Sequence, residues 1–161
     1  MNFNIREGLY EDLSAVARIT VLGWQQTYRG LICDEYLDSM DEEMILETNQ
    51  KLYFNNVLVL EEGGKIIGFI KYGKSDEEED KGQIYALYIL EGYKGYGYGK
   101  KLLFKAFDKL KEQGYNNIIL GCLVGNPSNG FYEHLGGECI GTKKSTFNNI
   151  ALEENIYLFK L

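Results

Sequence analysis

A glycine-rich turn in the middle of the chain carries the clearest chemical signal in the sequence. Three glycines alternate with two tyrosines: Gly95, Tyr96, Gly97, Tyr98 and Gly99. Glycine takes positive φ at no steric cost and lets backbone N–H groups approach a ligand closely. Lys100 and Lys101 follow, where a helix is expected to begin. A helix start presents unpaired N–H groups and a partial positive charge, so we predict an anion site for phosphate or pyrophosphate.

Two common nucleotide-binding motifs do not fit this turn. The Walker motif requires a glycine five positions before Gly99 and a hydroxyl after its lysine, but Lys94 and Lys101 occupy those positions. The dinucleotide fingerprint needs a glycine where Lys100 stands, and it follows an early strand of the chain. The remaining alternative is a turn without a ligand, although so short a turn would rarely need three alternating glycines.

The turn is expected to connect a strand at 83–90 to an amphipathic helix. The helix has one apolar stripe, made of Leu102, Leu103, Ala106, Phe107 and Leu110. Gly114 stands where a left-handed C-terminal cap belongs. The next strand, at 117–124, is separated from the first by this helix. The two strands are therefore predicted to be parallel neighbours joined by a right-handed crossover.

The rest of the chain predicts further strands and helices that position this unit. Apolar alternation and buried apolar runs favour strands at 3–6, 56–61, 65–72, 138–146 and 156–160. Helical spacing and capping residues favour helices at 11–28, 35–40, 42–51 and 127–135, with Asp34 as a cap. Gly63 and Gly64 predict a tight hairpin turn. These elements predict a mixed sheet with neither an internal repeat nor a linker.

The charge of the chain argues against duplex nucleic acid as its main partner. The 161 residues carry a formal net charge of −7, whereas the neutralisation of phosphates requires a basic surface. An acidic run at 76–80 is typical of a solvated loop between two strands. The alternative interpretation is that this run attracts cationic substrates.

Neither membrane insertion nor secretion is expected. No segment approaches the ~18 apolar residues that a membrane span needs, and the first residues lack the apolar core of a signal peptide. We therefore expect a soluble, cytoplasmic protein. The length suits one domain that buries roughly two thirds of the surface of the unfolded chain.

Disulfides and metal ions are not expected either. The three cysteines, Cys33, Cys122 and Cys139, are odd in number and far apart, which fits neither a disulfide framework nor a zinc ribbon. His134 is the only histidine of the chain, so a His-rich metal site is excluded. We expect His134 to lie on the surface.

Four segments carry motifs in a fixed order: residues 24–30, 86–89, 94–99 and 126–137. Residues 94–99 read Lys-Gly-Tyr-Gly-Tyr-Gly, and the last segment contains Asn-Pro followed by Phe-Tyr-Glu-His-Leu-Gly. They resemble the acetyl-CoA motif and the Asn-Pro…Phe-Tyr-Glu-x-Leu-Gly signature of the GCN5-related N-acetyltransferase (GNAT) family. Residues 86–89 are similar to its Leu-Tyr-Val strand, and residues 24–30 to its first helical region. The resemblance covers essentially the whole chain.

The resemblance implies both a fold and a reaction. The implied fold is α/β (α+β), a single domain over residues 1–161. Its mixed, mostly antiparallel twisted sheet has about seven strands, a parallel central pair and helices on both faces. The implied reaction is direct attack of a primary amine, on a small molecule or a protein, on acetyl-CoA as co-substrate. The family is also compatible with a homodimer formed through the terminal strands or the early helices.

The same resemblance implies roles for individual residues. The main chain of Leu87, Tyr88 and Ile89 is expected to lie along the pantetheine arm, and the N–H near Ile89 to stabilise the oxyanion. Asn126 is expected to bond the same arm. The pyrophosphate is expected on Gly95, Tyr96, Gly97, Tyr98, Gly99 and Lys100. Tyr132 is the candidate acid for the leaving thiolate, assisted by its position because a thiol pKa of ~8.5 lies below the ~10 of tyrosine.

Two residues depart from the family pattern. Lys94 replaces Gln or Arg, which keeps a positive charge but loses the planar fork that binds phosphate. Gln83 stands about where some members carry a glutamate base, and an amide does not accept a proton at neutral pH. No base is assigned; a water chain or a carboxylate in the acceptor cleft would serve. The alternative function is a non-catalytic acyl-CoA-binding or sensing module, favoured by Gln83 and opposed by Tyr132.

The acceptor side has one aromatic signal. Trp24 and Tyr28 lie four residues apart, on one face of the first predicted helix. They either pack in the core or line one wall of an acceptor cleft. The sequence names no particular amine.

Overall fold

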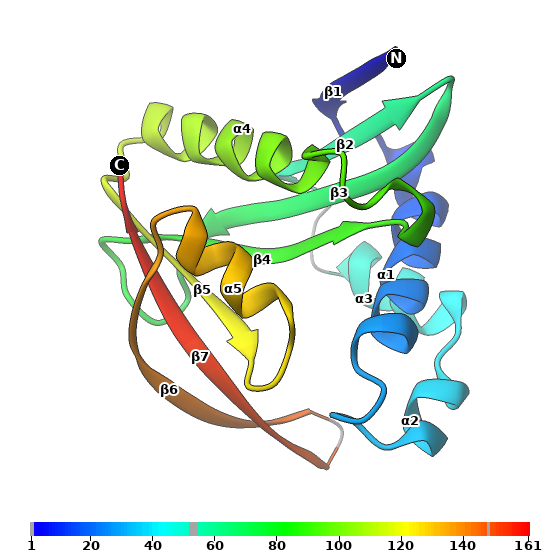
Figure 1. The fold of residues 1–161 in the computed structure, drawn as a ribbon. Helices are drawn as coiled ribbons and strands as arrows, with labels where there is room; N and C mark the ends of the chain where they lie inside the picture. Colours follow the sequence, from blue (N-terminus) through cyan, green and yellow to red (C-terminus); the bar gives the residue numbers. More distant parts are fainter. Residues whose placement is uncertain (1, 52–54, 148) are drawn as a thin grey trace. The chain divides into compact units, whose positions relative to one another are not determined.

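The computed structural model of the chain describes residues 2–51, 55–147 and 149–161 (Figure 1). Its elements in chain order are β1 (Phe3–Glu7), η1 (Tyr10–Asp12), α1 (Leu13–Thr27), α2 (Asp34–Ser39), α3 (Glu42–Lys51), β2 (Val57–Glu62), β3 (Lys65–Lys74), β4 (Gly82–Ile89), η2 (Glu91–Tyr93), α4 (Tyr98–Glu112), β5 (Asn117–Leu123), α5 (Ser128–His134), β6 (Glu138–Phe147) and β7 (Ile150–Lys160).

The strands form one sheet in the order β1-β2-β3-β4-β5-β7-β6. β4 and β5 pair in parallel, whereas β1–β2, β2–β3, β5–β7 and β6–β7 are antiparallel. This mixed, mostly antiparallel sheet with one parallel pair confirms the predicted fold class. None of the helices that the structure describes is both long and apolar enough to cross a membrane.

The contacts of the backbone divide the chain into two compact units. The first comprises Met1–Lys71 and Ala86–Ala106, and the second comprises Tyr72–Tyr85 and Phe107–Leu161. β3, β4 and α4 each begin in one unit and end in the other.

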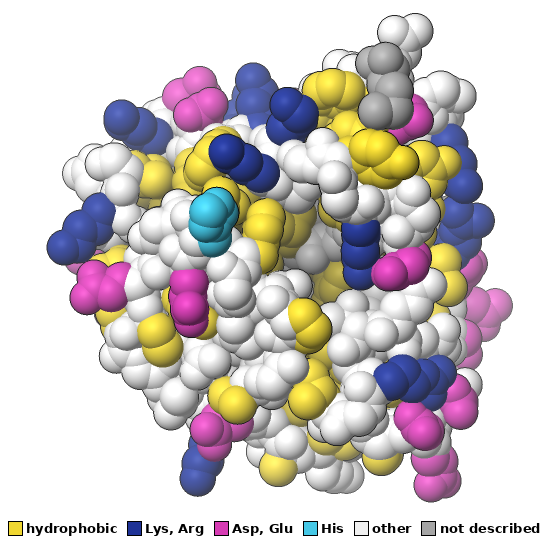
Figure 2. All heavy atoms as spheres, in the orientation of Figure 1, with side chains coloured by type: hydrophobic (Ala, Val, Ile, Leu, Met, Phe, Trp, Pro, Cys, Tyr) yellow, Lys and Arg dark blue, Asp and Glu magenta, His cyan; other side chains and the backbone are white. Residues whose placement is uncertain are grey.

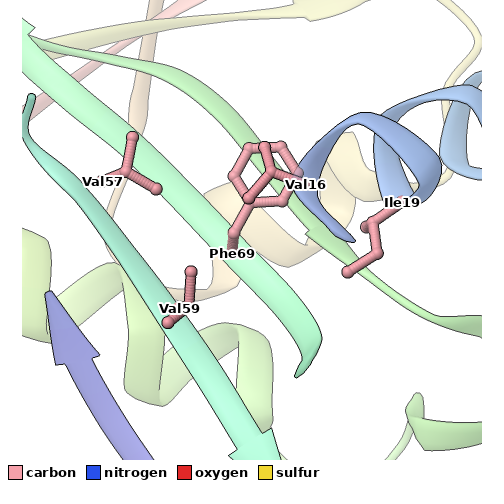
Figure 3. Packing of buried hydrophobic residues seen from close by; sticks show 5 residues of the cluster. All are labelled: Val16, Ile19, Val57, Val59 and Phe69. Atoms are coloured by element: carbon pink, nitrogen blue, oxygen red, sulfur yellow. The ribbon is translucent and has the colours of Figure 1, made fainter. Parts of the chain in front are cut away.

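The core of the first unit lies between α1 and the hairpin of β2 and β3. Figure 3 shows Val16 and Ile19 of α1 close to Val57, Val59 and Phe69 of the hairpin, all of them buried. Val16 and Ile19 lie on one face of α1 because the side chains of an α-helix repeat their direction about every 3.6 residues. Val57 and Val59 lie on one face of β2 because the side chains of a strand alternate between its two faces. The hairpin turn is made by two glycines with positive φ, as predicted.

β2 is buried on both faces, as its continuous apolar run predicts. Leu58 and Leu60 alternate with the valines that face α1, and both are fully buried. Glu62 follows in the same alternation and accepts a hydrogen bond from Tyr98 at the start of α4. Helices thus contact both faces of this strand.

The crossover of the second unit joins β4 to β5 through the end of α4. The parallel pairs are Gly82 with Ile118, Gln83 with Ile119 and Ile84 with Leu120. α4 ends at Glu112, and Gly114 beyond it has the left-handed backbone predicted for a C-terminal cap, with a φ of +99°. The N–H of Tyr115 donates to the carbonyl of Leu110 at 3.1 Å, which is the hydrogen bond of a Schellman cap.

The predicted last strand was wrong at its start. It was expected at 156–160, whereas β7 begins six residues earlier, at Ile150. The added segment contains Glu153, Glu154 and Asn155, and this polar composition hides its extended conformation. The added segment pairs with β6 along its whole length, starting with Phe147↔Ile150. This pairing supplies the backbone hydrogen bonds of the segment. Similarly, Asp34 is the first residue of α2 rather than its cap, which is Cys33.

Candidate active site

Two of the three glycines in the turn after β4 have a left-handed backbone. φ is +88° at Gly95 and +79° at Gly97, and a Cβ built on either residue would meet no atom within 4 Å. Glycine is therefore required here by backbone conformation and not by lack of space. Gly99 lies inside the first turn of α4 and needs no such conformation.

The start of α4 offers the donors of the predicted anion site. Its first intrahelical hydrogen bond runs from the N–H of Lys101 to the carbonyl of Gly97, at 3.2 Å. The N–H groups of Tyr98, Gly99 and Lys100 precede that bond and point toward the helix start. The chain thus brings three backbone donors and the positive end of a helix next to the positive-φ turn.

The side chains of this segment point in different directions. Tyr98 is buried, donates a hydrogen bond of 2.7 Å to Glu62 Oε2 and packs on Phe3 at 5.5 Å between ring centroids. The hydrogen bond to Glu62 raises the pKa of Tyr98. Tyr96 is exposed, and Lys94 forms an ion pair of 2.9 Å with Glu91. Tyr98 can therefore serve a ligand through its main chain only.

The second half of β4 is held closely against β3 within the first unit. The N–H of Leu90 donates to the carbonyl of Ile67 at 2.8 Å. A Cβ on Gly68 would lie 2.6 Å from Ile89 Cδ1 and 2.9 Å from the carbonyl oxygen of Tyr88. The absence of a side chain at position 68 allows this approach. The parallel pairs described for β4 end at Ile84, so Leu87, Tyr88 and Ile89 lie beyond them.

The two aromatic residues predicted for the acceptor side lie together beside β4. Trp24 and Tyr28 meet edge to face at 5.0 Å between centroids. The hydroxyl oxygen of Tyr28 lies 3.5 Å from that of Tyr88. Tyr88 also packs on Phe69 at 5.8 Å and on Gly23 of α1. α1 thus places both predicted residues next to the strand that carries Leu87 to Ile89.

Asn126 lies in the second unit, in the turn between β5 and α5. Its side chain is buried, and its Oδ1 accepts a hydrogen bond of 2.8 Å from the N–H of Ser128 at the start of α5. Among the described residues, none accepts a hydrogen bond from its Nδ2. That amide group is the part of Asn126 that fits the predicted contact with a pantetheine amide.

Tyr132 lies on α5, in the same unit, and its side chain is 9% exposed. Its ring contacts the rings of Phe131 and Tyr157, at 5.2 and 6.1 Å between centroids. The position of the ring is therefore fixed by packing. His134 is exposed, as predicted.

Sequence reasoning missed Asn129, which ties the Asn126 turn and α5 to β7. Its Nδ2 donates to the carbonyls of Leu123 and Asn126, at 2.9 and 2.8 Å. Its Oδ1 accepts from Asn155 Nδ2 and from the hydroxyl of Tyr157, at 3.0 and 2.8 Å. The available signal was an amide three residues after Asn126, at the second position of α5.

The titratable groups near α5 are perturbed by burial. Tyr157 is fully buried, which raises its pKa to about 12, assisted by its hydrogen bond to Glu133. Burial likewise raises the pKa of Cys122 to about 12. Neither group is ionised near neutral pH.

In the part of the chain that the structure describes, no three His, Cys, Asp or Glu residues are grouped to hold a metal ion. On the face drawn in Figure 2, acidic and basic side chains are interspersed.

Comparison with known proteins identifies the family. The model of the Acetyltransferase (GNAT) family matches residues 19–137, which include the glycine turn, Asn126 and Tyr132. The chain belongs to this family. It is therefore an acetyl-CoA-dependent N-acetyltransferase that acts on an amine, as the motifs predicted.

Individual GNAT relatives agree with this assignment. An uncharacterised N-acetyltransferase of Bacillus subtilis, YuaI, is 28% identical over 153 residues, covering 93% of this chain and 88% of the relative. The [ribosomal protein bS18]-alanine N-acetyltransferase of Haemophilus influenzae is 31% identical over 112 residues, covering 70% and 67%. The crystal structure of the PaiA N-acetyltransferase of Thermoplasma acidophilum, in complex with coenzyme A, shares the fold. Its TM-score is 0.76 at 23% identity, with both chains covered completely.

Proposed function

We propose that this GNAT enzyme transfers the acetyl group to a primary amine by direct attack, in the cytoplasm. The observation that carries the proposal is the turn at Gly95 and Gly97 with the three backbone donors at the start of α4. The acceptor is a small amine or an amino group of a protein.

The phosphates of acetyl-CoA fit the donors at the start of α4. Three N–H groups and the helix dipole suit the pyrophosphate, with further main-chain donors in residues 95–97. Lys100 is exposed and adds a positive charge in the first turn of the helix. Backbone donors do not depend on the identity of the preceding side chain, so Lys94 in place of Gln or Arg is compatible with binding.

The pantetheine arm is assigned to the main chain of Leu87, Tyr88 and Ile89. These residues continue β4 beyond its described parallel pairs, and an extended ligand can add to such a strand. The Nδ2 group of Asn126 is assigned to an amide carbonyl of the same arm. When bound, acetyl-CoA supplies an activated thioester carbonyl, and the N–H near Ile89 is assigned to the oxyanion.

Tyr132 is assigned as the proton donor to the leaving thiolate. Packing by Phe131 and Tyr157 fixes its ring, so the hydroxyl can be held in one place during the reaction. A positioned acid contributes about 10²–10⁴-fold to a rate. Trp24 and Tyr28 are assigned to the acceptor side, where their partly buried rings suit the aliphatic part of an amine.

Binding and turnover test these assignments separately. Calorimetric titration with acetyl-CoA is expected to show saturable binding, and release of free CoA is followed with a panel of amines. The panel contains spermidine, lysine and a peptide that begins with alanine. Tyr132→Phe should lower kcat by at least tenfold and leave acetyl-CoA affinity nearly unchanged. An unchanged rate would remove the acid role from Tyr132.

Binding without turnover on any amine of the panel would favour the alternative, a non-catalytic acyl-CoA-binding module. Absence of binding at millimolar acetyl-CoA would overturn the assignment of the glycine turn. His134→Gln is the control for Tyr132→Phe, because it changes an exposed side chain of α5 and leaves the Tyr132 hydroxyl and the rings that pack on it unchanged.

A further inference from the structure

A carboxylate of β7, Glu154, lies in the second unit in a place where apolar residues are expected. It is the partner of Leu123 in the β5–β7 ladder, so the two side chains share one face of the sheet. Ile156 and Leu158 follow it on the same face of β7. A Cβ built on Gly121 of β5 would overlap Oε2 of Glu154 and lie 3.0 Å from its Cδ. The carboxylate therefore occupies space that any other residue at position 121 would fill.

Glu154 shares its face of the sheet with Gln83. Gln83 is paired with Ile119 of β5, and alternation places Ile119, Gly121 and Leu123 on one face. The opposite face carries Tyr157, whose hydroxyl bonds to α5. Glu154 thus lies on the face away from α5. The described pairs between β4 and β5 end at Leu120. Glu154 is paired with Leu123, which lies three residues further along β5.

The carboxylate is partly buried and weakly compensated. Burial raises the pKa of Glu154, and only the charge of Lys143, its partner on β6, acts in the other direction. Lys143 itself makes an ion pair with Glu77. The charge of Glu154 also acts on Cys122, a described neighbour whose thiol is neutral. Among the described residues, none donates a hydrogen bond to the carboxylate, so its oxygens can accept one from a ligand or water.

A carboxyl group in such surroundings is costly for stability and suited to proton transfer. Partial burial without a hydrogen-bonded partner disfavours the ionised form. A base works best when its pKa lies near the working pH, and burial shifts the pKa of Glu154 upward, in that direction. Gln83, on the same face, cannot accept a proton.

Building on the proposed function, we propose that Glu154 is the base that accepts the proton of the acceptor ammonium, directly or through one water. The carboxylate takes one proton from R–NH₃⁺ and leaves the neutral amine. The amine nitrogen bonds to the acetyl carbon, the carbon–sulfur bond breaks, and the thiolate takes a proton from Tyr132. The second proton of the nitrogen returns to Tyr132 through water, and Glu154 releases its proton to solvent.

Glu154→Gln tests this role, with Glu153→Gln as the matched control. Glu153 is the preceding residue of β7, and its side chain is exposed on the opposite face of the sheet. Its substitution by Gln removes the same charge as Glu154→Gln but leaves the Glu154 side chain in place. Both variants are assayed with acetyl-CoA and either spermidine or the alanine-initiated peptide, from pH 5 to 9. Glu154→Gln is expected to lower kcat/KM for the amine about 100-fold, as loss of a general base does. The rise of the rate through the pKa of the base should also disappear.

Three further measurements separate catalysis from structure. Acetyl-CoA affinity of Glu154→Gln should stay within twofold of the wild type, and its melting temperature should not fall, since an amide carries no charge to desolvate. Glu154→Asp should recover part of the activity and the pH dependence. Glu153→Gln should match the wild type throughout.

The inference and the proposed function fail in different ways. If the wild type binds acetyl-CoA but transfers acetyl to no amine, the proposed function is overturned. If the wild type is active and Glu154→Gln keeps its rate and pH profile, only the role of Glu154 is overturned. Equal losses in the two glutamine variants, or a loss of acetyl-CoA binding in Glu154→Gln, would also overturn it.

Discussion

Gly23 of α1 lies directly against the ring of Tyr88 in β4. A Cβ built on Gly23 would be 2.5 Å from Cδ1 and 3.0 Å from Cε1 of that ring. A glycine inside a helix costs about 1 kcal/mol relative to alanine. Here it lets the helix that carries Trp24 and Tyr28 approach the strand assigned to the pantetheine arm.

Gly23→Ala should therefore destabilise the protein in spite of its better helix propensity. Overpacking costs about 1–3 kcal/mol, which exceeds the gain in propensity, and the helix should shift away from Tyr88. We expect a lower melting temperature and a KM for the amine raised several-fold. In a Tyr88→Ala background the ring is absent, so Gly23→Ala should be neutral or stabilising. A loss of stability that is equal in both backgrounds would contradict the packing argument.

Gly97→Ala should weaken the binding of acetyl-CoA. An L-residue at φ +79° costs about 1–2 kcal/mol, and the free loop can relieve this strain by moving its N–H groups. Binding must restore the strained form, which corresponds to an affinity loss of roughly 5–30-fold. Gly92→Ala is the control, since Gly92 lies in η2 outside the left-handed region and also has open space around it. Calorimetry on the two variants decides, and equal affinities would show that the backbone conformation at Gly97 is not required.

The glycine turn and its flanking elements could be predicted because local sequence determines them. Positive φ at Gly95 and Gly97, the apolar stripe of α4 and the cap at Gly114 depend on residues close in the chain. The parallel pairing of β4 with β5 followed from the crossover rule, and the mixed, mostly antiparallel sheet from the resemblance to the GNAT family. The strand at the start of β7 could not be predicted, because partner strands and not its own composition hold it extended.

That missed boundary also hid a candidate site residue. With the last strand starting at residue 156, Glu154 reads as part of a polar loop. With β7 starting at Ile150, alternation places Glu154 in register with Ile156 and Leu158, where a carboxylate is unexpected. Asn129 was missed for a similar reason, because three of its four hydrogen bonds span turns or distant strands.

Asn129→Ala should raise the KM for acetyl-CoA more than it lowers kcat. It removes both hydrogen bonds to the turn between β5 and α5, so Asn126 should lose its fixed position. Buried groups left without partners should also lower stability, by about 1–3 kcal/mol each. Tyr157→Phe is the control: it removes one bond to Asn129 but keeps both bonds to the turn. That variant should be less stable with an unchanged KM for acetyl-CoA, and a KM raised equally in both would contradict the role of the turn.

Two of the three thiols should react in the native protein. Cys33 and Cys139 are exposed, whereas Cys122 is buried with a pKa raised to about 12, so its reactive thiolate is almost absent at pH 8. Titration with a disulfide reagent should count two thiols before unfolding and three in denaturant. Cys122→Ala should leave the native count unchanged, and Cys139→Ala should lower it by one. Three rapidly reacting thiols in the native protein would show that β5 opens easily. The count also sets the baseline for assays that detect released CoA.

The raised pKa of Glu154 should leave a signature in the pH dependence of stability. Because the folded pKa lies above the ordinary value of 4.5, the folded state binds more protons than the unfolded state between the two values. The favourable contribution of the protonated carboxyl is therefore complete below pH 4.5 and is lost as the pH rises through the folded pKa. In Glu154→Gln this loss is absent, so the stability of the variant relative to the wild type should increase with pH and then level off. Urea unfolding of both proteins from pH 4 to 8 measures this difference, with Glu153→Gln as the exposed control. A difference that stays constant over this range would mean that Glu154 titrates as an ordinary exposed carboxylate.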